Sequence, residues 1–175
     1  KMKMGFVHES VPIKPYPSII KYPNNLHIVK SNLEGIWFDV EVDGNIEHFH
    51  APILGSFNAI NLTAVILVSY YLGMSIHEIK VALESLPQVE HRLQKIEAGG
   101  KLIIDDSFNG NLEGMLEAVN ICSNHIGRRV IITPGLVEST DEANILLAKV
   151  INENFDFVIL TGSLNTQLLS SNIDK

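Results

Sequence analysis

A run of short polar residues follows a stretch that has the composition of a buried strand. The strand is Leu102-Ile103-Ile104, and the run is Asp105-Asp106-Ser107-Phe108-Asn109-Gly110-Asn111. At the carboxyl end of a strand in an open parallel sheet, such residues lie where these sheets bind ligands. A carboxylate there can accept hydrogen bonds from ribose hydroxyls, and Asn111 can cap the next helix. Asp, Asn and Gly are also common in plain strand-to-helix turns, so the run alone leaves both interpretations open.

Two further groups of polar residues have side chains that suit a nucleotide. Arg92, directly after His91, carries forked donors that can clamp a phosphate. Asn58 and Asn61 precede a long apolar segment, and asparagine amides can pair with the donor and acceptor edge of adenine. Each group has a simpler alternative, because an arginine is often a surface ion-pair residue and asparagines often cap helices.

The elements that must position Asn58 and Asn61 are predicted from the first half of the sequence. The first 32 residues are rich in proline and predict extended chain and loops. Residues 36–42 and 46–53 have strand periodicity on either side of Asp43-Gly44, which predicts a β-hairpin.

Two helices are predicted after this hairpin. The first, at 62–72, is apolar all round and must therefore be buried. The second begins with a capping box formed by Ser75 and Glu78 and ends at Pro87.

The second half of the sequence alternates strands with helices, which predicts a parallel sheet with right-handed crossovers. The predicted strands are 102–104, 130–132 and 157–160. Three helices are predicted between and after these strands. The first has an apolar stripe formed by Met115, Val119, Cys122 and Ile126. The second follows a capping box of Ser139 and Glu142, and the third begins after Ser163. The change of pattern predicts a domain boundary between Pro87 and Leu93.

Composition and charge exclude several classes of protein. With 46% hydrophobic and 19% charged residues the chain is globular. A net charge of −7 provides no basic field for nucleic acid, and we expect no nucleic-acid partner. No apolar run is long enough to span a bilayer, and we expect no membrane insertion. Cys122 is the only cysteine, which excludes an internal disulfide and a thiolate metal cluster and favours a cytoplasmic location.

Taken in order, three motifs resemble the Mur ligase family. They are Gly55-Ser56-Phe57-Asn58-Ala59-Ile60-Asn61, His91-Arg92-Leu93, and the run 105–111 followed by Met115. The two aspartates, serine, aromatic residue and two asparagines of the last motif resemble the MurF type. The resemblance extends from about Glu34 to Gly162 and implies an α/β fold. Residues 1–90 would form the C-terminal part of a central ATP-binding domain, and residues 91–175 part of a Rossmann-like C-terminal ligase domain.

The resemblance also implies an activity, its substrates and its cofactors. Enzymes of the MurF type add D-alanyl-D-alanine to UDP-N-acetylmuramoyl-tripeptide, through an acyl phosphate made from ATP, in peptidoglycan precursor synthesis. It further implies roles for residues of this chain: Asn61 contacts adenine with Asn58 beside it, Arg92 contacts the nucleotide phosphates, and Asp106 holds the ribose with Asn109 in the same loop. Mg²⁺ would be bound mainly by residues outside this sequence, and no catalytic residue is assigned within it.

The sequence departs from the family pattern at several positions. Phe57 replaces a common histidine, Phe108 a common tyrosine, Gly110 a common alanine and Leu112 a common proline, and the loop 133–138 lacks the usual leading glycine. A phosphate-binding loop of the form G-x-x-x-x-G-K-[ST] does not occur. We therefore expect the chain to be an internal piece of a longer enzyme and to be inactive alone. The alternatives are another Mur or folylpolyglutamate-type ligase, or a non-catalytic nucleotide-binding module.

Overall fold

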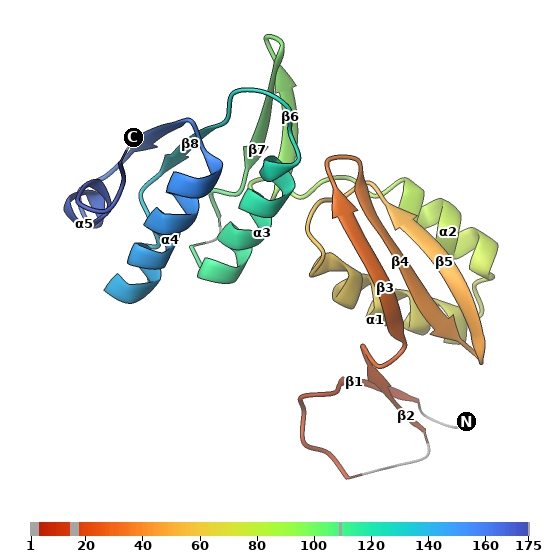
Figure 1. The fold of residues 1–175 in the computed structure, drawn as a ribbon. Helices are drawn as coiled ribbons and strands as arrows, with labels where there is room; N and C mark the ends of the chain where they lie inside the picture. Colours follow the sequence, from red (N-terminus) through yellow and green to blue (C-terminus); the bar gives the residue numbers. More distant parts are fainter. Residues whose placement is uncertain (1–3, 15–17, 109, 175) are drawn as a thin grey trace. The chain divides into compact units, whose positions relative to one another are not determined.

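The computed structural model describes residues 4–14, 18–108 and 110–174, and shows a chain of mixed α/β architecture (Figure 1). Contacts divide it into two compact units, residues 1–88 and 89–175. The assignment of these units to two ligase domains stays a prediction. Within the described residues, none of the helices is both long enough and apolar enough to cross a membrane.

The first unit combines a small parallel strand pair, an antiparallel sheet and two helices. Strands β1 and β2 pair in parallel, and β3, β4 and β5 form an antiparallel meander in that order. In chain order its elements are β1 (Gly5–His8), β2 (Ile19–Tyr22), β3 (Leu26–Asn32), β4 (Gly35–Val42), β5 (Asn45–Ala51), α1 (Asn58–Tyr71) and α2 (Ile76–Glu84).

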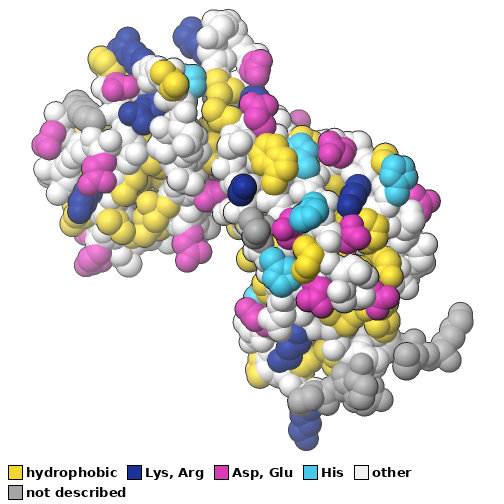
Figure 2. Space-filling model, turned by 45° about the vertical axis from the view of Figure 1, so that its right-hand side comes forward, with side chains coloured by type: hydrophobic (Ala, Val, Ile, Leu, Met, Phe, Trp, Pro, Cys, Tyr) yellow, Lys and Arg dark blue, Asp and Glu magenta, His cyan; other side chains and the backbone are white. Residues whose placement is uncertain are grey.

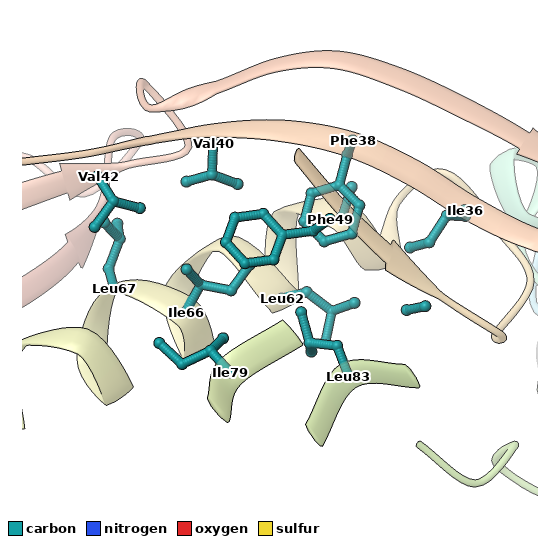
Figure 3. Close-up of a cluster of buried hydrophobic side chains, with 12 residues drawn as sticks. Ile36, Phe38, Val40, Val42, Phe49, Leu62, Ile66, Leu67, Ile79 and Leu83 are labelled. Carbon is teal, nitrogen blue, oxygen red and sulfur yellow. The ribbon is translucent and has the colours of Figure 1, made fainter. Parts of the chain in front are cut away.

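The core of this unit lies between the meander and the two helices (Figure 3). Alternate residues of β4 point into it, and the rings of Phe38 and Phe49 stack with centroids 5.8 Å apart. Helix α1 contributes Leu62 and Ile66, and α2 contributes Ile79. One side of α1 faces this core, but Val65 is 52% and Leu72 83% exposed, so the prediction that the segment 62–72 is buried all round is wrong.

Two other predictions for the first unit are confirmed and one more is wrong. The hairpin of β4 and β5 turns at Asp43-Gly44, and both residues have positive φ. The capping box is present, since the Ser75 amide donates to Glu78 Oε2 (2.8 Å) and the Glu78 amide donates to Ser75 Oγ (3.2 Å). The prediction of extended chain and loops without regular strands over the first 32 residues is wrong, because β1, β2 and β3 lie there. Strand β3 was missed because its pairing with β4 identifies it as a strand, whereas its own periodicity does not.

The second unit contains two separate strand pairs and three helices. Its elements are β6 (Gln94–Ala98), β7 (Lys101–Asp105), α3 (Leu112–Ser123), β8 (Val130–Thr133), α4 (Asp141–Asn154), β9 (Phe157–Leu160) and α5 (Thr166–Ser170). Strands β8 and β9 pair in parallel, and a core formed with α3 and α4 covers one of their faces. Cys122 is half-buried against this core, which agrees with its place on the apolar stripe.

The predicted three-stranded parallel sheet is wrong in one strand. Among the described residues of this unit, β7 pairs with β6 in an antiparallel hairpin, and only β8 and β9 are parallel. The chain reverses at Gly99-Gly100, with φ of 56° and 70°. Two consecutive residues of positive φ are what a two-residue type I′ hairpin turn requires, and glycine takes this conformation without steric cost.

Two local predictions in this unit are also wrong. Ile126 was placed on the apolar stripe of α3, but this helix ends at Ser123 and Ile126 is fully exposed. The capping box of α4 was placed at Ser139, whereas the cap is Thr140, whose hydroxyl accepts from the Ala143 amide (3.3 Å).

The loop that follows β8 is held by a buried asparagine of α4. Asn144 is completely buried; its Oδ1 accepts from the Leu136 amide (2.8 Å) and its Nδ2 donates to the Leu136 carbonyl (3.1 Å). Gly135, at φ 77°, passes so close that a Cβ there would lie 2.7 Å from Asn144 Oδ1. The loop at this carboxyl strand end is therefore held at Leu136, where the Asn144 side chain bonds both polar groups of the backbone and Asn165 Nδ2 also donates to the carbonyl (3.2 Å).

Replacing Asn144 by alanine is expected to lower the free energy of unfolding by about 2 kcal/mol or more, because the buried Leu136 amide loses its acceptor. Asn154→Ala in the same helix is the matched control, since the hydrogen bond of its side chain seen among the described residues is to the carbonyl one turn before it (2.9 Å). Urea denaturation of both variants makes the comparison. Equal losses would show that the loop does not depend on Asn144.

Candidate nucleotide-binding site

The candidate site is built on the end of β7 and the loop that leads to α3. Asp105 is the last residue of β7, and its Oδ1 accepts from the Ser107 amide (3.0 Å), which bends the chain away from the strand. Asn111 caps α3 as predicted, with its Oδ1 accepting from the Gly114 amide (2.7 Å). A cap with β-region backbone fixes where the helix begins.

The turn 91–93 is joined to this loop by three contacts. The Phe108 amide donates to the His91 carbonyl (3.1 Å), and the Leu93 amide donates to Asp106 Oδ1 (3.1 Å). His91 Nδ1 lies 2.8 Å from Asp105 Oδ2. Although the two segments are 13 or more residues apart in sequence, they form one local structure.

Left-handed backbone brackets Arg92. His91 has φ 62° and Leu93 has φ 49°, values uncommon for residues other than glycine. Leu93 is only 2% exposed, and its side chain anchors the turn. Strained conformations of this kind persist where surrounding contacts hold them, as the three contacts above do here.

The two neighbouring aspartates have opposite electrostatic environments. Burial raises the pKa of Asp106 above its usual value, and the Leu93 amide and the Arg92 charge offset only part of this effect. Hydrogen bonds from Ser107 and His91 lower the pKa of Asp105. Asp105 is therefore a structural carboxylate with its partners in place. Asp106 uses Oδ1 for the Leu93 amide, and no hydrogen bond to its Oδ2 is seen among the described residues.

Arg92 packs on an aromatic ring. Its guanidinium carbon lies 4.4 Å from the centroid of the Phe108 ring, and both side chains are exposed. The ion pairs among the described residues do not involve Arg92, so the surface ion-pair alternative is not realised. Acidic and basic side chains are interspersed on the face drawn in Figure 2.

Asn58 and Asn61 lie in the other unit, in the first turn of α1. The cap of α1 is Phe57, so the alternative in which the asparagines cap this helix is wrong. Asn58 Nδ2 donates to the Leu54 carbonyl (2.7 Å), and Asn61 is exposed. Asn109, the remaining predicted site residue, lies outside the described residues.

The structure therefore brings Arg92 and Asp106 together in one cluster, through Leu93 and Phe108. Sequence reasoning missed the roles of His91, Leu93 and Phe108 in this cluster. An aromatic residue three positions after Asp105 was visible in the sequence. That this ring would contact Arg92 was not visible, because the contact depends on the reversal of the chain between β6 and β7.

Comparisons with known proteins find relatives in sequence and in fold, although no family model matches the sequence. A UDP-N-acetylmuramoyl-tripeptide–D-alanyl-D-alanine ligase of Buchnera aphidicola is 28% identical over 148 residues, which are 81% of this chain and 32% of the relative. The chain thus spans about a third of the length of this curated relative.

Solved structures of similar fold include two ligases of the same type. The UDP-N-acetylmuramoylalanyl-D-glutamyl-2,6-diaminopimelate–D-alanyl-D-alanyl ligase of Acinetobacter baumannii aligns with a TM-score of 0.77 and 19% identity, over 89% of this chain and 36% of that one. The MurF ligase of Thermotoga maritima in complex with ADP aligns with a TM-score of 0.65 and 18% identity, over 82% of this chain and 34% of that one. In sequence this chain is therefore similar to ligases that add D-alanyl-D-alanine, and in fold it is similar to solved Mur ligases of the MurF type.

Proposed function

We propose that this chain works in an ATP-dependent ligase that adds D-alanyl-D-alanine to UDP-N-acetylmuramoyl-tripeptide during peptidoglycan precursor synthesis. The observation that carries the proposal is the cluster at the end of β7, where Arg92 and Asp106 are held by the same turn. Arg92 supplies a cation at this strand end, and the Oδ2 of Asp106 accepts no hydrogen bond from the residues that the structure describes; such a pair suits the phosphates and the ribose of one nucleotide.

We propose the following roles for these residues toward ATP. Arg92 is exposed and would donate to the phosphates, and Asp106 would accept from ribose hydroxyls through Oδ2. Asn61 would bind the adenine edge, with Asn58 beside it and Asn109 near the ribose. ATP would supply the phosphoryl group that activates the peptide carboxylate for attack by the dipeptide amine. Mg²⁺ would be bound mainly by residues outside these 175, and the phosphate-binding loop would come from there as well.

The type of amine acceptor is the part of the proposal that an assay tests most directly. The ligase that carries this sequence is expected to release phosphate from ATP with UDP-N-acetylmuramoyl-tripeptide and D-alanyl-D-alanine together. Diaminopimelate, lysine and glutamate serve as competing acceptors. A preference for one of these would replace the proposal by another Mur or folylpolyglutamate-type ligase, and no turnover with any acceptor would favour a non-catalytic nucleotide-binding module.

The 175-residue polypeptide alone is expected not to hydrolyse ATP, because the sequence has no loop whose amides and lysine hold the β- and γ-phosphates. Phosphate release from ATP and D-alanyl-D-alanine should equal that of a buffer blank. Release above the blank that is abolished by Asp106→Ala would contradict this expectation, since contaminating ATPase would not respond to the substitution.

A further inference from the structure

Phe108 is a large apolar residue in a position that burial does not explain. Its side chain is 68% exposed, in a loop whose other residues are short and polar. Its backbone is fixed, because its amide donates to the His91 carbonyl. The ring contact described for it is with Arg92.

That contact restricts a side chain that is otherwise long and flexible. A free arginine loses rotamer entropy when it is fixed by a ligand, and holding it beforehand reduces this loss. The left-handed turn fixes where the Arg92 side chain leaves the backbone. The ring of Phe108, whose centroid lies 4.4 Å from the guanidinium carbon, then restrains the far end of the side chain.

We propose that Phe108 is a positioning residue that holds the Arg92 guanidinium in the orientation in which it contacts nucleotide phosphates. The inference rests on the proposed role of Arg92 in ATP binding. It assigns to Phe108 an action through Arg92, not a contact of its own with the nucleotide. Because cation–π contacts at exposed sites are weak, the expected effect is about two- to five-fold in affinity.

The chain offers a matched control for such a contact. Arg128 lies over the ring of Phe157 at 3.9 Å, in the same unit, and Phe157 is also exposed. Phe157→Leu removes an arginine–phenylalanine stack of the same kind away from the candidate site. A general effect of losing an exposed stack would therefore show in both variants, and a positioning effect only in Phe108→Leu.

Kinetics of the ligase that carries this sequence test the functional side. Phe108→Leu is expected to raise KM for ATP about two- to five-fold with kcat unchanged, since it weakens a contact made in both ground and transition states. Phe108→Tyr should keep the wild-type KM, and Phe157→Leu should also leave it unchanged. In an Arg92→Ala background, Phe108→Leu should have no further effect. Additive effects would overturn the proposal, because Phe108 would then contact the nucleotide itself.

Nuclear magnetic resonance on the 175-residue polypeptide tests the stack without any activity. The Nε–Hε resonance of Arg92 should carry a ring-current shift that disappears in Phe108→Leu and persists in Phe108→Tyr and Phe157→Leu. Fast motion of this group, measured by ¹⁵N relaxation, should increase only in Phe108→Leu. An unchanged resonance and unchanged relaxation would overturn the proposal. If the resonance responds but Arg92→Ala leaves KM for ATP unchanged, the proposed phosphate role of Arg92 fails and the stack stands.

Discussion

Replacing Arg92 by alanine is expected to raise KM for ATP of the ligase about ten- to a hundred-fold, because a hydrogen bond to a charged group contributes about 1.5–3 kcal/mol. Arg92→Lys should cost less, since lysine keeps the charge and loses only the forked geometry and the stack on Phe108. Initial rates over a range of ATP concentrations measure the effect.

The stability of the same variants separates a binding role from a structural one. Arg92 is exposed and takes part in none of the ion pairs described, so its loss should change the melting temperature little. A lowered melting temperature with an unchanged KM for ATP would mean that Arg92 only supports the turn. The assignment of the phosphate site to this cluster would then be wrong.

Asp106→Asn is expected to lower ATP use by a similar factor, about ten- to a hundred-fold, because a neutral amide replaces a charged acceptor for the ribose hydroxyls. Stability at neutral pH should be unchanged or higher. The asparagine Oδ1 can still accept from the Leu93 amide, and the variant no longer buries a charge. Loss of function together with a gain of stability is a combination that a structural aspartate would not give.

The difference in stability between Asp106→Asn and the wild type should depend on pH, because the pKa of Asp106 is raised. The folded state binds this proton more tightly than the unfolded state, whose Asp106 has a pKa near 3.8. The group therefore favours the folded state fully below that value, and the benefit is lost as pH rises through the folded pKa. The stability advantage of Asp106→Asn should accordingly shrink as pH falls through this window.

Asp105 provides a control of opposite sign. Its pKa is lowered, chiefly by Ser107 and then by His91, so its carboxylate favours the folded state above its usual pKa. Asp105→Asn should therefore reduce stability at neutral pH, by a small amount because the side chain is still partly open to solvent, which screens its charge. Identical pH profiles for the two asparagine variants would contradict the different environments of the two aspartates.

Local features of the fold could be predicted from the sequence. The Ser75–Glu78 capping box, the hairpin turn at Asp43-Gly44 and the Asn111 cap are each specified by residues within a few positions of one another. Features that depend on distant partners were missed. Strand β3 is recognised by its pairing with β4, and β7 was assigned to a parallel sheet because its true partner β6 has no clear alternation.

The hairpin of β6 and β7 could have been found. Gly99-Gly100 between two strand-like segments is a sequence signal for a two-residue turn with positive φ, and it was taken only as a break. This error mattered for the site, because the reversal brings Gln94 opposite Asp105 and thereby brings the turn 91–93 to the loop after β7. The candidate residues were predictable by type, and their mutual contacts were not.

The left-handed backbone on both sides of Arg92 also limits which sequences this site can accept during evolution. Position 91 is exposed, yet a β-branched residue there would meet the full steric cost of positive φ, so asparagine, aspartate, histidine and glycine are the tolerated choices. Position 93 must accept the same backbone strain and still fill a buried space, which leucine does at 2% exposure. Glycine at either position would relieve the backbone strain, but it would also make the backbone more flexible at that position. Homologous sequences should therefore vary less at position 91 than its exposure alone would suggest. They should also vary less at position 93 than a requirement for any hydrophobic residue would suggest.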